Sequence, residues 1–314
     1  MNVKQAVITQ LIKAEGGVIS GQEIAKSIDK SRVAVRKAIV SLSEQGFEIV
    51  AEQSNGYRLV NKPDVLIPEY IASFLPPELS LFYYEEIDST NSEAKRLLSS
   101  GNKAPFIVVA KEQKGGRGRR GRVFSSPIGG IYFSLVLPTE HMKSTELVTT
   151  ASALAVCKAL EEVSGETLSI KWVNDVYYKS KKLVGILTEG VVNMELGQVE
   201  DIIIGIGINY EIPTFNPELK DIAISLYPKG KAPLSRAEVL GLLVKALNNT
   251  LASDFLSEYK SRCFVLNKPI NVIKNDSIRP AFALDLDEKA HLVVKYENGE
   301  VEHLSSGEVT IRLA

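Results

Sequence analysis

Apolar residues recur at helical spacing in the first part of the chain. Val3 and Val7 lie on one face of a predicted amphipathic helix. A second helix is predicted to begin at Ser20, with Glu23 completing a capping box, and a third to begin at Ser31. The pattern therefore predicts three short helices in succession.

A strand pattern follows these helices. Residues 47–50 and 57–60 are predicted to form two short strands around a turn at Asn55-Gly56. Three short helices followed by a β-hairpin are typical of a winged helix-turn-helix. We assign this unit to residues 1–61.

Longer patterns occupy residues 62–267, after a linker marked by four prolines. The predicted strands are 81–87, 106–110, 131–137, 168–173, 182–189 and 201–208. The predicted helices are 91–99, 147–163 and 236–251, with Thr90–Glu93 capping the first and Ser235–Glu238 the last. Because helices and strands do not alternate regularly, the pattern predicts an α+β domain with a mixed sheet.

Short alternating strands are predicted in residues 268–314. They are 270–273, 281–286, 291–296, 301–304 and 308–313, with a turn at Asn298-Gly299. A unit of roughly 45 residues with this pattern fits a small SH3-like barrel. The chain is thus expected to be an α+β protein of three domains.

Composition excludes several classes of protein. Hydrophobic residues make up 45% and charged residues 24% of the 314 positions, which is usual for a soluble globular protein. The apolar and glycine stretch 202–208 is far shorter than the roughly 20 residues of a membrane-spanning helix. Two cysteines and the absence of an N-terminal signal pattern favour a cytoplasmic protein with no membrane contact. Three widely separated histidines give no metal-ligand spacing, so no protein-bound metal site is expected.

Two basic clusters occur in a chain whose net charge is −1. Residues 26–37 carry five basic and one acidic side chain, a balance of +4, and residues 111–122 carry six and one, a balance of +5. Two such clusters indicate two separate anionic partners. The first coincides with the third predicted helix, where a recognition helix would enter the major groove of DNA. The predicted DNA-binding residues are Lys30, Ser31, Arg32, Arg36 and Lys37. A winged helix that contacts only proteins is the alternative.

The second cluster contains the arginine–glycine segment 115–122. Glycines let backbone N–H groups converge on an anion, and arginines add forked hydrogen-bond donors. The segment lacks the Gly-Lys-Ser/Thr ending of a Walker A loop. Composition alone leaves a flexible or nucleic-acid-binding surface loop open as the alternative.

Polar residues also gather at the ends of predicted elements. Asn174 and Asp175 follow an apolar strand and offer oxygen atoms to Mg²⁺ or to a proton, although Asn-Asp is also usual in turns. Residues 205–209 lack the third glycine of a dinucleotide-binding fingerprint, so these glycines are expected to let a ligand lie flat against the strand. Residues 88–91 place hydroxyls and an amide at a helix start, where helix capping is the alternative.

Together these segments resemble the biotin–protein ligases. The segments occur in the order and spacing of that family: Asp-Ser-Thr-Asn (88–91), Gly-Arg-Gly-Arg-Arg-Gly-Arg (116–122), Lys-Trp-Val-Asn-Asp (171–175), Lys-Leu-Val-Gly-Ile-Leu (182–187) and Gly-Ile-Gly-Ile-Asn (205–209). With the winged helix, the chain resembles the bifunctional kind, a biotin–[acetyl-CoA-carboxylase] ligase that is also the biotin operon repressor. Val173, where the family usually has proline, and Phe124, where tryptophan is common, depart from the pattern.

The resemblance implies an activity in two steps on a catalytic domain like that of class II aminoacyl-tRNA synthetases. Biotin would react with ATP and Mg²⁺ to give biotinyl-5′-AMP and pyrophosphate, with no permanently bound cofactor. A lysine of a biotin carboxyl carrier protein would then attack the adenylate. The implied catalytic residues are Lys182, Arg119 and Asp175.

The resemblance also implies which residues bind ligands. Those implied to bind biotin or biotinyl-AMP are Ser89, Thr90, Asn91, Gln113, Arg117, Gly118, Arg119 and Lys182. Further candidates for the ligand site are Gly116, Arg120, Arg122, Phe124, Lys171, Trp172, Asn174, Gly185, Gly205, Gly207 and Asn209. A homodimer formed with biotinyl-AMP would bind palindromic operator DNA.

Three other functions remain open. The chain could be a ligase whose DNA-binding unit is not functional, a lipoate–protein ligase, or a transcription factor that senses a ligand without catalysis. The arginine–glycine segment and the Lys-Trp-Val-Asn-Asp segment favour biotin over lipoate. A sensor would need no cationic loop over a reactive phosphate.

Overall fold

The computed structural model describes residues 2–52, 56–140, 142, 144–193, 197–274, 277–305 and 310–313. They form two compact units, Met1–Tyr83 with Ala232–Leu242, and Tyr84–Lys231 with Leu243–Ala314. Across the described ranges, no helix combines the length and the apolar composition needed to cross a membrane. Cys157 and Cys263 are both buried and not bonded to each other.

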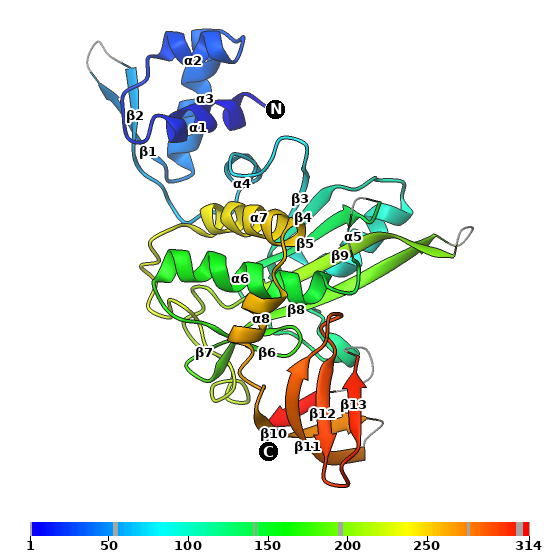
Figure 1. The fold of residues 1–314 in the computed structure, drawn as a ribbon. Helices are drawn as coiled ribbons and strands as arrows, with labels where there is room; N and C mark the ends of the chain where they lie inside the picture. The colour runs from blue at the N-terminus through cyan, green and yellow to red at the C-terminus, as the bar shows by residue number, and fades with distance from the viewer. Residues whose placement is uncertain are drawn as a thin grey trace. The chain divides into compact units, whose positions relative to one another are not determined.

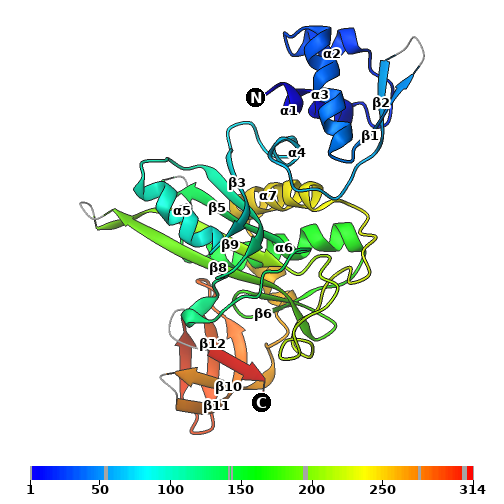
Figure 2. The same cartoon turned by 180° about the vertical axis from the view of Figure 1, so that it is seen from behind.

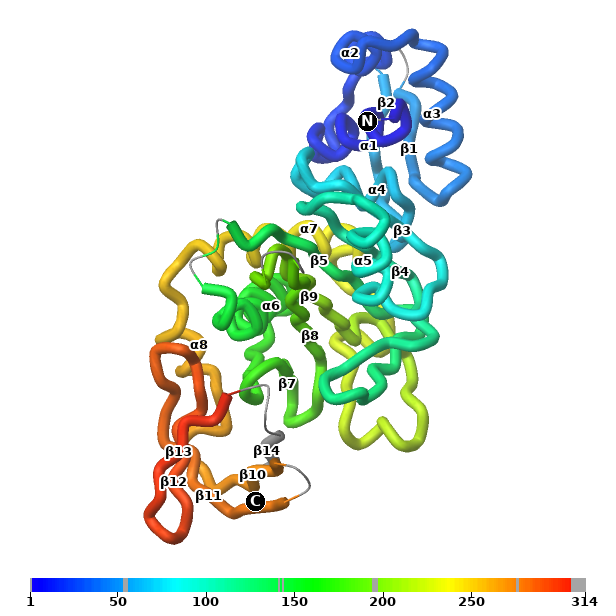
Figure 3. The backbone as a smooth tube through the Cα atoms, turned by 90° about the vertical axis from the view of Figure 1, so that its right-hand side faces the viewer, coloured from blue at the N-terminus to red at the C-terminus, as the bar shows by residue number. Residues whose placement is uncertain are grey.

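The predicted winged helix-turn-helix is confirmed in the first unit (Figure 1). Its elements are α1 (Val3–Lys13), α2 (Gly21–Ser27), α3 (Arg32–Glu44), β1 (Glu48–Glu52) and β2 (Gly56–Asn61). The strands pair antiparallel, and Asn55 of the predicted turn lies outside the described residues. Helix α3 packs against both α1 and α2, and Figure 3 shows it at the edge of this unit.

Local sequence determines where these helices begin. The Ser20 hydroxyl accepts a hydrogen bond from the Glu23 N–H at 3.0 Å, and the Glu23 carboxylate accepts one from the Ser20 N–H at 3.0 Å. This is the predicted capping box. The hydroxyl of Ser31 caps α3 by accepting from the Ala34 N–H at 3.2 Å. The polar side chains therefore satisfy free N–H groups at the start of both helices.

The predicted linker after the hairpin is a packed segment of the first unit. It contains α4 (Pro68–Ala72), which buries Tyr70 completely. A proline can begin a helix because the first turn needs no N–H from it. Asp64 accepts hydrogen bonds from the backbone N–H and the guanidinium of Arg236, at 2.8 and 2.7 Å, at the start of α7 (Arg236–Ala252). These contacts fix the segment in place.

A seven-stranded sheet has the order β3-β4-β5-β9-β8-β7-β6. Its strands are β3 (Ser80–Ile87), β4 (Phe106–Gln113), β5 (Ile131–Pro138), β6 (Ser169–Lys171), β7 (Asp175–Tyr178), β8 (Lys181–Asn193) and β9 (Gln198–Ile208). The pairings from β4 to β6 are antiparallel. Helix α5 (Thr90–Ser99) connects β3 to its neighbour β4, a connection typical of parallel strands. The predicted mixed sheet is therefore confirmed.

Helices cover both faces of this sheet. Helix α5 packs against β4, β5 and β9, and α6 (Val148–Ser164) packs against β6 to β9. In Figure 1 α6 lies in front of the sheet, and in Figure 2, from behind, α5 lies in front. Strands β4 and β5 bury successive residues, as strands with two covered faces do. The core of the second unit thus lies between the sheet and these helices.

Two local predictions around the sheet are wrong. The strand predicted at 168–173 ends at Lys171, turns through 172–174 and returns as β7. The turn contains the buried Trp172 and Val173. Because both residues are apolar, the hydrophobic pattern predicted a strand that is too long. Thr90 does not cap α5, because Ser89 is the N-cap and makes no capping hydrogen bond. At α7, by contrast, Ser235 and Glu238 form the predicted reciprocal bonds.

A second sheet follows near the C-terminus, with the strand order β13-β12-β11-β10-β14 (Figure 3). Its antiparallel strands are β10 (Lys268–Lys274), β11 (Ser277–Leu286), β12 (Leu292–Tyr296), β13 (Val301–Leu304) and β14 (Thr310–Leu313). Buried positions in β12 alternate with more exposed ones, which is typical of a sheet with one covered face. The start of the strand predicted at 308–313 lies outside the described residues.

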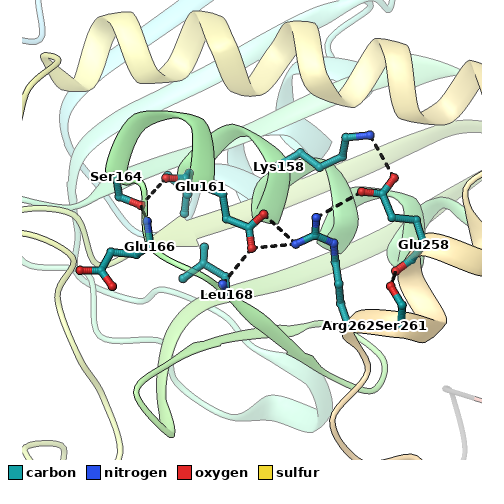
Figure 4. Close-up of polar contacts among 9 residues, drawn as sticks. Lys158, Glu161, Ser164, Glu166, Leu168, Glu258, Ser261 and Arg262 are labelled. Carbon is teal, nitrogen blue, oxygen red and sulfur yellow. Dashed lines mark hydrogen bonds and ion pairs between the residues drawn. The ribbon is translucent and has the colours of Figure 1, made fainter.

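A short helix that the pattern did not predict, α8 (Leu256–Arg262), packs against α6. The Arg262 guanidinium donates to both carboxylate oxygens of Glu161 at 2.7 Å and to Glu258 at 3.2 Å (Figure 4). Glu161 also accepts the Leu168 N–H at 2.8 Å. Arg262 therefore ties α8 to α6 and to the segment that enters β6.

Loss of Arg262 should destabilise the protein more than loss of its neighbour Lys158. Arg262 and Glu161 are 22% and 21% exposed, so Arg262→Ala leaves a shielded carboxylate without its partner. The expected loss in the free energy of unfolding is about 1–3 kcal/mol. Lys158 is 50% exposed and pairs with Glu258 at 3.1 Å, so Lys158→Ala should cost under about 0.5 kcal/mol. Urea unfolding measures both losses, and equal losses would contradict this role of Arg262.

Candidate functional site

A pocket in the second unit brings together residues from six segments of the sequence. They come from the start of α5, the end of β4, the arginine–glycine loop, the β6–β7 turn, and strands β8 and β9. The predicted residues that line it are Ser89, Thr90, Asn91, Gln113, Arg117, Gly118, Arg119, Arg120, Arg122, Phe124, Lys171, Trp172, Asn174, Asp175, Lys182, Gly185, Gly205 and Gly207.

The lining of the pocket is strongly basic. Among the described residues that form it, Asp175 is the one carboxylate. The six basic side chains around it are Arg117, Arg119, Arg120, Arg122, Lys171 and Lys182. A concave surface with this excess of positive charge concentrates anionic ligands.

One side of the pocket is a buried hydrogen-bond network. The side-chain carbonyl of Gln113 accepts from the Thr90 N–H at 2.8 Å and from the Thr90 hydroxyl at 3.2 Å, while its amide donates to Ser126 at 2.8 Å. The hydroxyl of Ser134 lies 2.8 Å from the Thr90 hydroxyl and 2.6 Å from the side-chain oxygen of Asn91. The orientation of these polar groups is therefore fixed by the protein itself.

Glu189 holds Asn91 from the other side. The Asn91 amide donates to Glu189 at 2.8 Å, and Lys95 donates to the other carboxylate oxygen at 2.7 Å. Burial opposes ionisation of Glu189, but the hydrogen bonds from Lys95 and Asn91 outweigh it and lower its pKa. An ionised Glu189 accepts from the Asn91 nitrogen and so turns the Asn91 oxygen toward Ser134.

Sequence reasoning missed Ser134 and Glu189. The available signal was a single serine inside the otherwise apolar strand β5, since a buried hydroxyl needs a hydrogen-bond partner. The apolar lining consists of Val123, Ile186, Leu187 and Ile206; the last three lie in the expected apolar strands around Gly185 and Gly205, although the sequence did not single out any of them. Apolar residues in strands give no such signal, because most of them belong to the core.

Two cations lie beside Asp175. The Nζ atom of Lys182 is 2.7 Å from Oδ1 of Asp175, as an ion pair rather than an aligned hydrogen bond. The same Nζ lies 5.8 Å from the centre of the Phe124 ring. Arg119 donates from Nη1 to the Asn174 side-chain oxygen at 3.2 Å. Strands β7 and β8 and the arginine–glycine loop thus bring a carboxylate, an amine and a guanidinium together.

The electrostatic environment of Arg119 disfavours its charged form. Burial lowers the pKa of the Arg119 guanidinium, and Arg120 and Arg122 lower it further, whereas Asp175 opposes the shift. Arginine nevertheless stays protonated in proteins. A bound anion would therefore relieve the repulsion among these cations.

The arginine–glycine loop is a closed turn with its own hydrogen bonds. The Phe124 N–H donates to the Gly116 carbonyl at 2.9 Å, and the Gly118 N–H donates to the Arg122 carbonyl at 2.7 Å. Arg120 has a φ of 57°, in the left-handed region, at the tip of this turn. The backbone therefore forms a compact turn that presents Arg117, Arg119, Arg120 and Arg122 at the pocket.

Glycines in strands β8 and β9 leave room for the side chains of Phe124 and Asn91. A Cβ atom at Gly207 would lie 2.4 Å from the Phe124 ring, and one at Gly185 would lie 2.8 Å from it. A Cβ at Gly205 would lie 2.0 Å from the Asn91 side-chain oxygen. The flat surface expected at these glycines is therefore occupied by an aromatic ring and an amide.

Two predicted candidates do not line the pocket. A Cβ at Gly116 would lie 2.3 Å from the Phe124 carbonyl oxygen, so this glycine serves the packing of the loop. Asn209 is buried, and its backbone N–H donates to the Leu183 carbonyl at 3.0 Å. Both residues support the pocket from outside it.

The predicted DNA-binding residues gather at the start of α3 in the first unit. The set Lys30, Ser31, Arg32, Arg36 and Lys37 is exposed. No ion pair neutralises any of its four basic side chains in the described part of the chain. This second basic site thus lies exposed at the surface of the first unit.

Family models match both parts of the chain. The Biotin/lipoate A/B protein ligase family matches residues 83–209, and an HTH domain matches residues 3–58. The first match spans the pocket from Ser89 to Gly207, and the second spans α1 to β2 up to Arg58. The two basic sites thus fall in two recognised domains.

Named relatives combine the same two parts. The "Bifunctional ligase/repressor BirA" of Bacillus subtilis is 38% identical over 245 residues, which cover 76% of this chain and 75% of that protein. The protein of the same name from Escherichia coli is 25% identical over 313 residues, covering 96% and 95%. A solved structure, the biotin protein ligase from Aquifex aeolicus in complex with biotin and ATP, is 30% identical and superposes with a TM-score of 0.65, covering 75% of this chain and 99% of that one.

The likeness extends over both functional parts of the chain. Sequence identity of 38% across three quarters of the Bacillus subtilis protein exceeds what a shared fold alone would give. The domain matches agree with it in order and position. The chain therefore belongs to the biotin–protein ligase family, in its BirA-type branch of bifunctional ligase/repressors.

Proposed function

We propose that this chain activates biotin with ATP, transfers it to a carrier protein and represses biotin synthesis genes. The observation that carries this proposal is the pocket in which six basic side chains surround one carboxylate beside a buried polar network. The relative from Aquifex aeolicus, described as a complex with biotin and ATP, supports these substrates. The exposed basic helix α3 supports the DNA-binding role.

Formation of the adenylate joins two negatively charged groups. A carboxylate oxygen of biotin attacks the α-phosphate of ATP, a C–O–P linkage forms, and pyrophosphate leaves. Repulsion between the reactants must be screened, and positioned cations do this effectively in a pocket away from water. We assign this role to Arg117, Arg119 and Lys182.

The polar network suits the ureido ring of biotin. This ring carries N–H donors and a carbonyl acceptor, and Ser89, Thr90, Asn91 and Gln113 provide the complementary groups. The hydrocarbon part of biotin would lie against the apolar lining of β8 and β9, near Ile206. Such a split between polar and apolar walls orients the carboxylate toward the cations.

Transfer requires an amine and the exclusion of water. The lysine amine of a biotin carboxyl carrier protein attacks the carbonyl carbon of the mixed anhydride, an amide forms and AMP leaves. Asp175 is the nearby group able to take the proton that the amine releases. The loop from Arg117 to Arg122 would cover the adenylate and protect it from hydrolysis.

Magnesium would enter with the nucleotide. Within the described residues no three histidine, cysteine or carboxylate side chains form a metal-binding cluster. Mg²⁺ commonly uses one or two carboxylates together with substrate phosphates, and Asp175 with Asn174 provides such oxygens in the pocket. When bound, it would neutralise charge on the triphosphate.

The proposed function also implies a division of the chain into three domains. We divide the chain into a DNA-binding domain (1–61), a catalytic domain (62–267) like that of class II aminoacyl-tRNA synthetases, and a C-terminal domain (268–314). The five antiparallel strands of the last domain support an SH3-like barrel. Binding of biotinyl-AMP would favour a homodimer that presents two α3 helices to operator DNA in the cytoplasm.

An incorporation assay tests the ligase. Protein, ATP, Mg²⁺ and labelled biotin should label a biotin carrier domain on one lysine, and equal labelling with lipoate would reassign the substrate. Lys182→Ala should slow biotin-dependent release of pyrophosphate by about 100-fold or more, because a cation at the reacting phosphate is lost. Lys181→Ala is the control, since Lys181 only donates to the Lys220 carbonyl at 2.7 Å outside the pocket. Near-normal release by Lys182→Ala would refute its assignment.

The loop should retain the intermediate. Arg119→Gly removes a charged donor, so biotinyl-AMP should escape about 10- to 100-fold faster and label unrelated lysines. The measurement is the rate at which radiolabelled adenylate leaves the protein. Lys114→Ala, beside the loop but outside the pocket, should release it at the normal rate. Equal release by Arg119→Gly and the unaltered protein would count against the loop.

DNA binding should depend on the adenylate. With biotin and ATP, dimer formation should increase affinity for a palindromic site by about 100-fold or more over either ligand alone. Footprinting across a ligand series measures this difference. Strong binding without ligands would leave DNA binding intact and exclude the switch.

A further inference from the structure

The exposed face of α3 has an apolar centre. Val33 and Val40 are 65% and 51% exposed, although both belong to the helix that packs into the winged-helix core. The side chains that α3 buries are Val35, Ala38, Ile39 and Leu42. Seven residues apart, Val33 and Val40 lie one above the other on the opposite face.

Cations flank this apolar line on both sides. At 3.6 residues per turn, Arg36 is about 60° to one side of Val33 and Lys37 about 40° to the other. Both side chains are exposed. The helix therefore presents a narrow apolar strip between two positive edges.

Folding of the unit does not account for Val33. An exposed valine has a lower helix propensity than alanine and buries little surface in the core. Its position in the first turn of α3 places it where a recognition helix meets base edges. In the major groove the centre of an inserted helix faces the bases, its flanks face the phosphates, and thymine is the base that offers a methyl group.

We propose that Val33 is a specificity-determining residue that contacts the 5-methyl group of a thymine in the operator. Arg36 and Lys37 are then placed for guanine edges or phosphates on either side of that contact. The proposal rests on the repressor function and specifies one of its contacts. The surplus of four positive charges in residues 26–37 favours a polyanion over an apolar protein partner.

Uracil substitution tests the contact directly, because uracil lacks only the 5-methyl group and keeps the same hydrogen-bonding edges. The full chain with biotin and ATP first selects a duplex from a random-sequence pool. Each thymine of that duplex is then replaced singly by uracil. At one or more positions per half-site the unaltered protein should bind about fourfold more weakly, the value of one buried methyl group.

Val33→Ala removes the two methyl groups beyond Cβ, so the preference for thymine over uracil at that position should fall well below fourfold. Alanine is favoured in helices, so the variant should fold normally. Val18→Ala is the matched control, since Val18 is 44% exposed but lies outside α3. It should keep the fourfold preference for thymine.

The possible results separate this contact from the wider function. A selected duplex that is insensitive to every uracil, or an unchanged uracil penalty in Val33→Ala, would overturn the proposal and leave the repressor function standing. Failure to select any duplex would overturn both, while the incorporation assay still tests the ligase. If Val33→Ala altered only self-association in sedimentation, the strip would be a protein contact, and the proposal would also be overturned.

Discussion

The basic pocket depends on holding several cations close together around one carboxylate. Two local contacts offset the mutual repulsion of these cations. Asp175 pairs with Lys182 at 2.7 Å, and Asn174 accepts a hydrogen bond from Arg119 at 3.2 Å. Burial of Arg119, which lowers its pKa, adds to this cost. An anionic ligand reverses that cost when it binds, because it replaces repulsion with attraction. The cation repulsion raises the free energy of the empty pocket, and this favours binding of a phosphate-bearing molecule.

The polar side of the pocket is stabilised by hydrogen bonds within the protein, without repulsion between like charges. Here Thr90 bonds to Gln113 and Ser134, and Asn91 bonds to Ser134 and Glu189, before any ligand binds. A buried network of this kind specifies one arrangement of donors and acceptors. Strands β5, β9 and β8 pair in a continuous antiparallel register next to this network. In the proposed function, recognition of the neutral ring would thus come from fixed geometry, and recognition of the phosphate would come from charge.

The sequence predicted the pocket well where residues close in the chain act together. The arginine–glycine loop and the Lys-Trp-Val-Asn-Asp turn are such segments, and both line the pocket. It failed where distant residues are partners: Thr90 begins α5 after the N-cap Ser89, and its hydroxyl donates to Gln113, 23 residues away. Ser134 and Glu189 are single polar residues in apolar strands, and their partner Asn91 is fixed only by the sheet. The early start of the turn was hidden because Trp172 and Val173 are apolar and buried.

One chain thus carries two basic sites that differ in burial, and this difference separates their chemistry. The cations of α3 are exposed and would bind a polyanion through release of its counterions, which weakens steeply as salt increases. Arg119 and Lys182 lie in a pocket, where salt screens charges much less. The small anion can therefore stay bound under conditions in which the DNA is released. That order suits a protein in which the intermediate held in one site decides whether the other site is used.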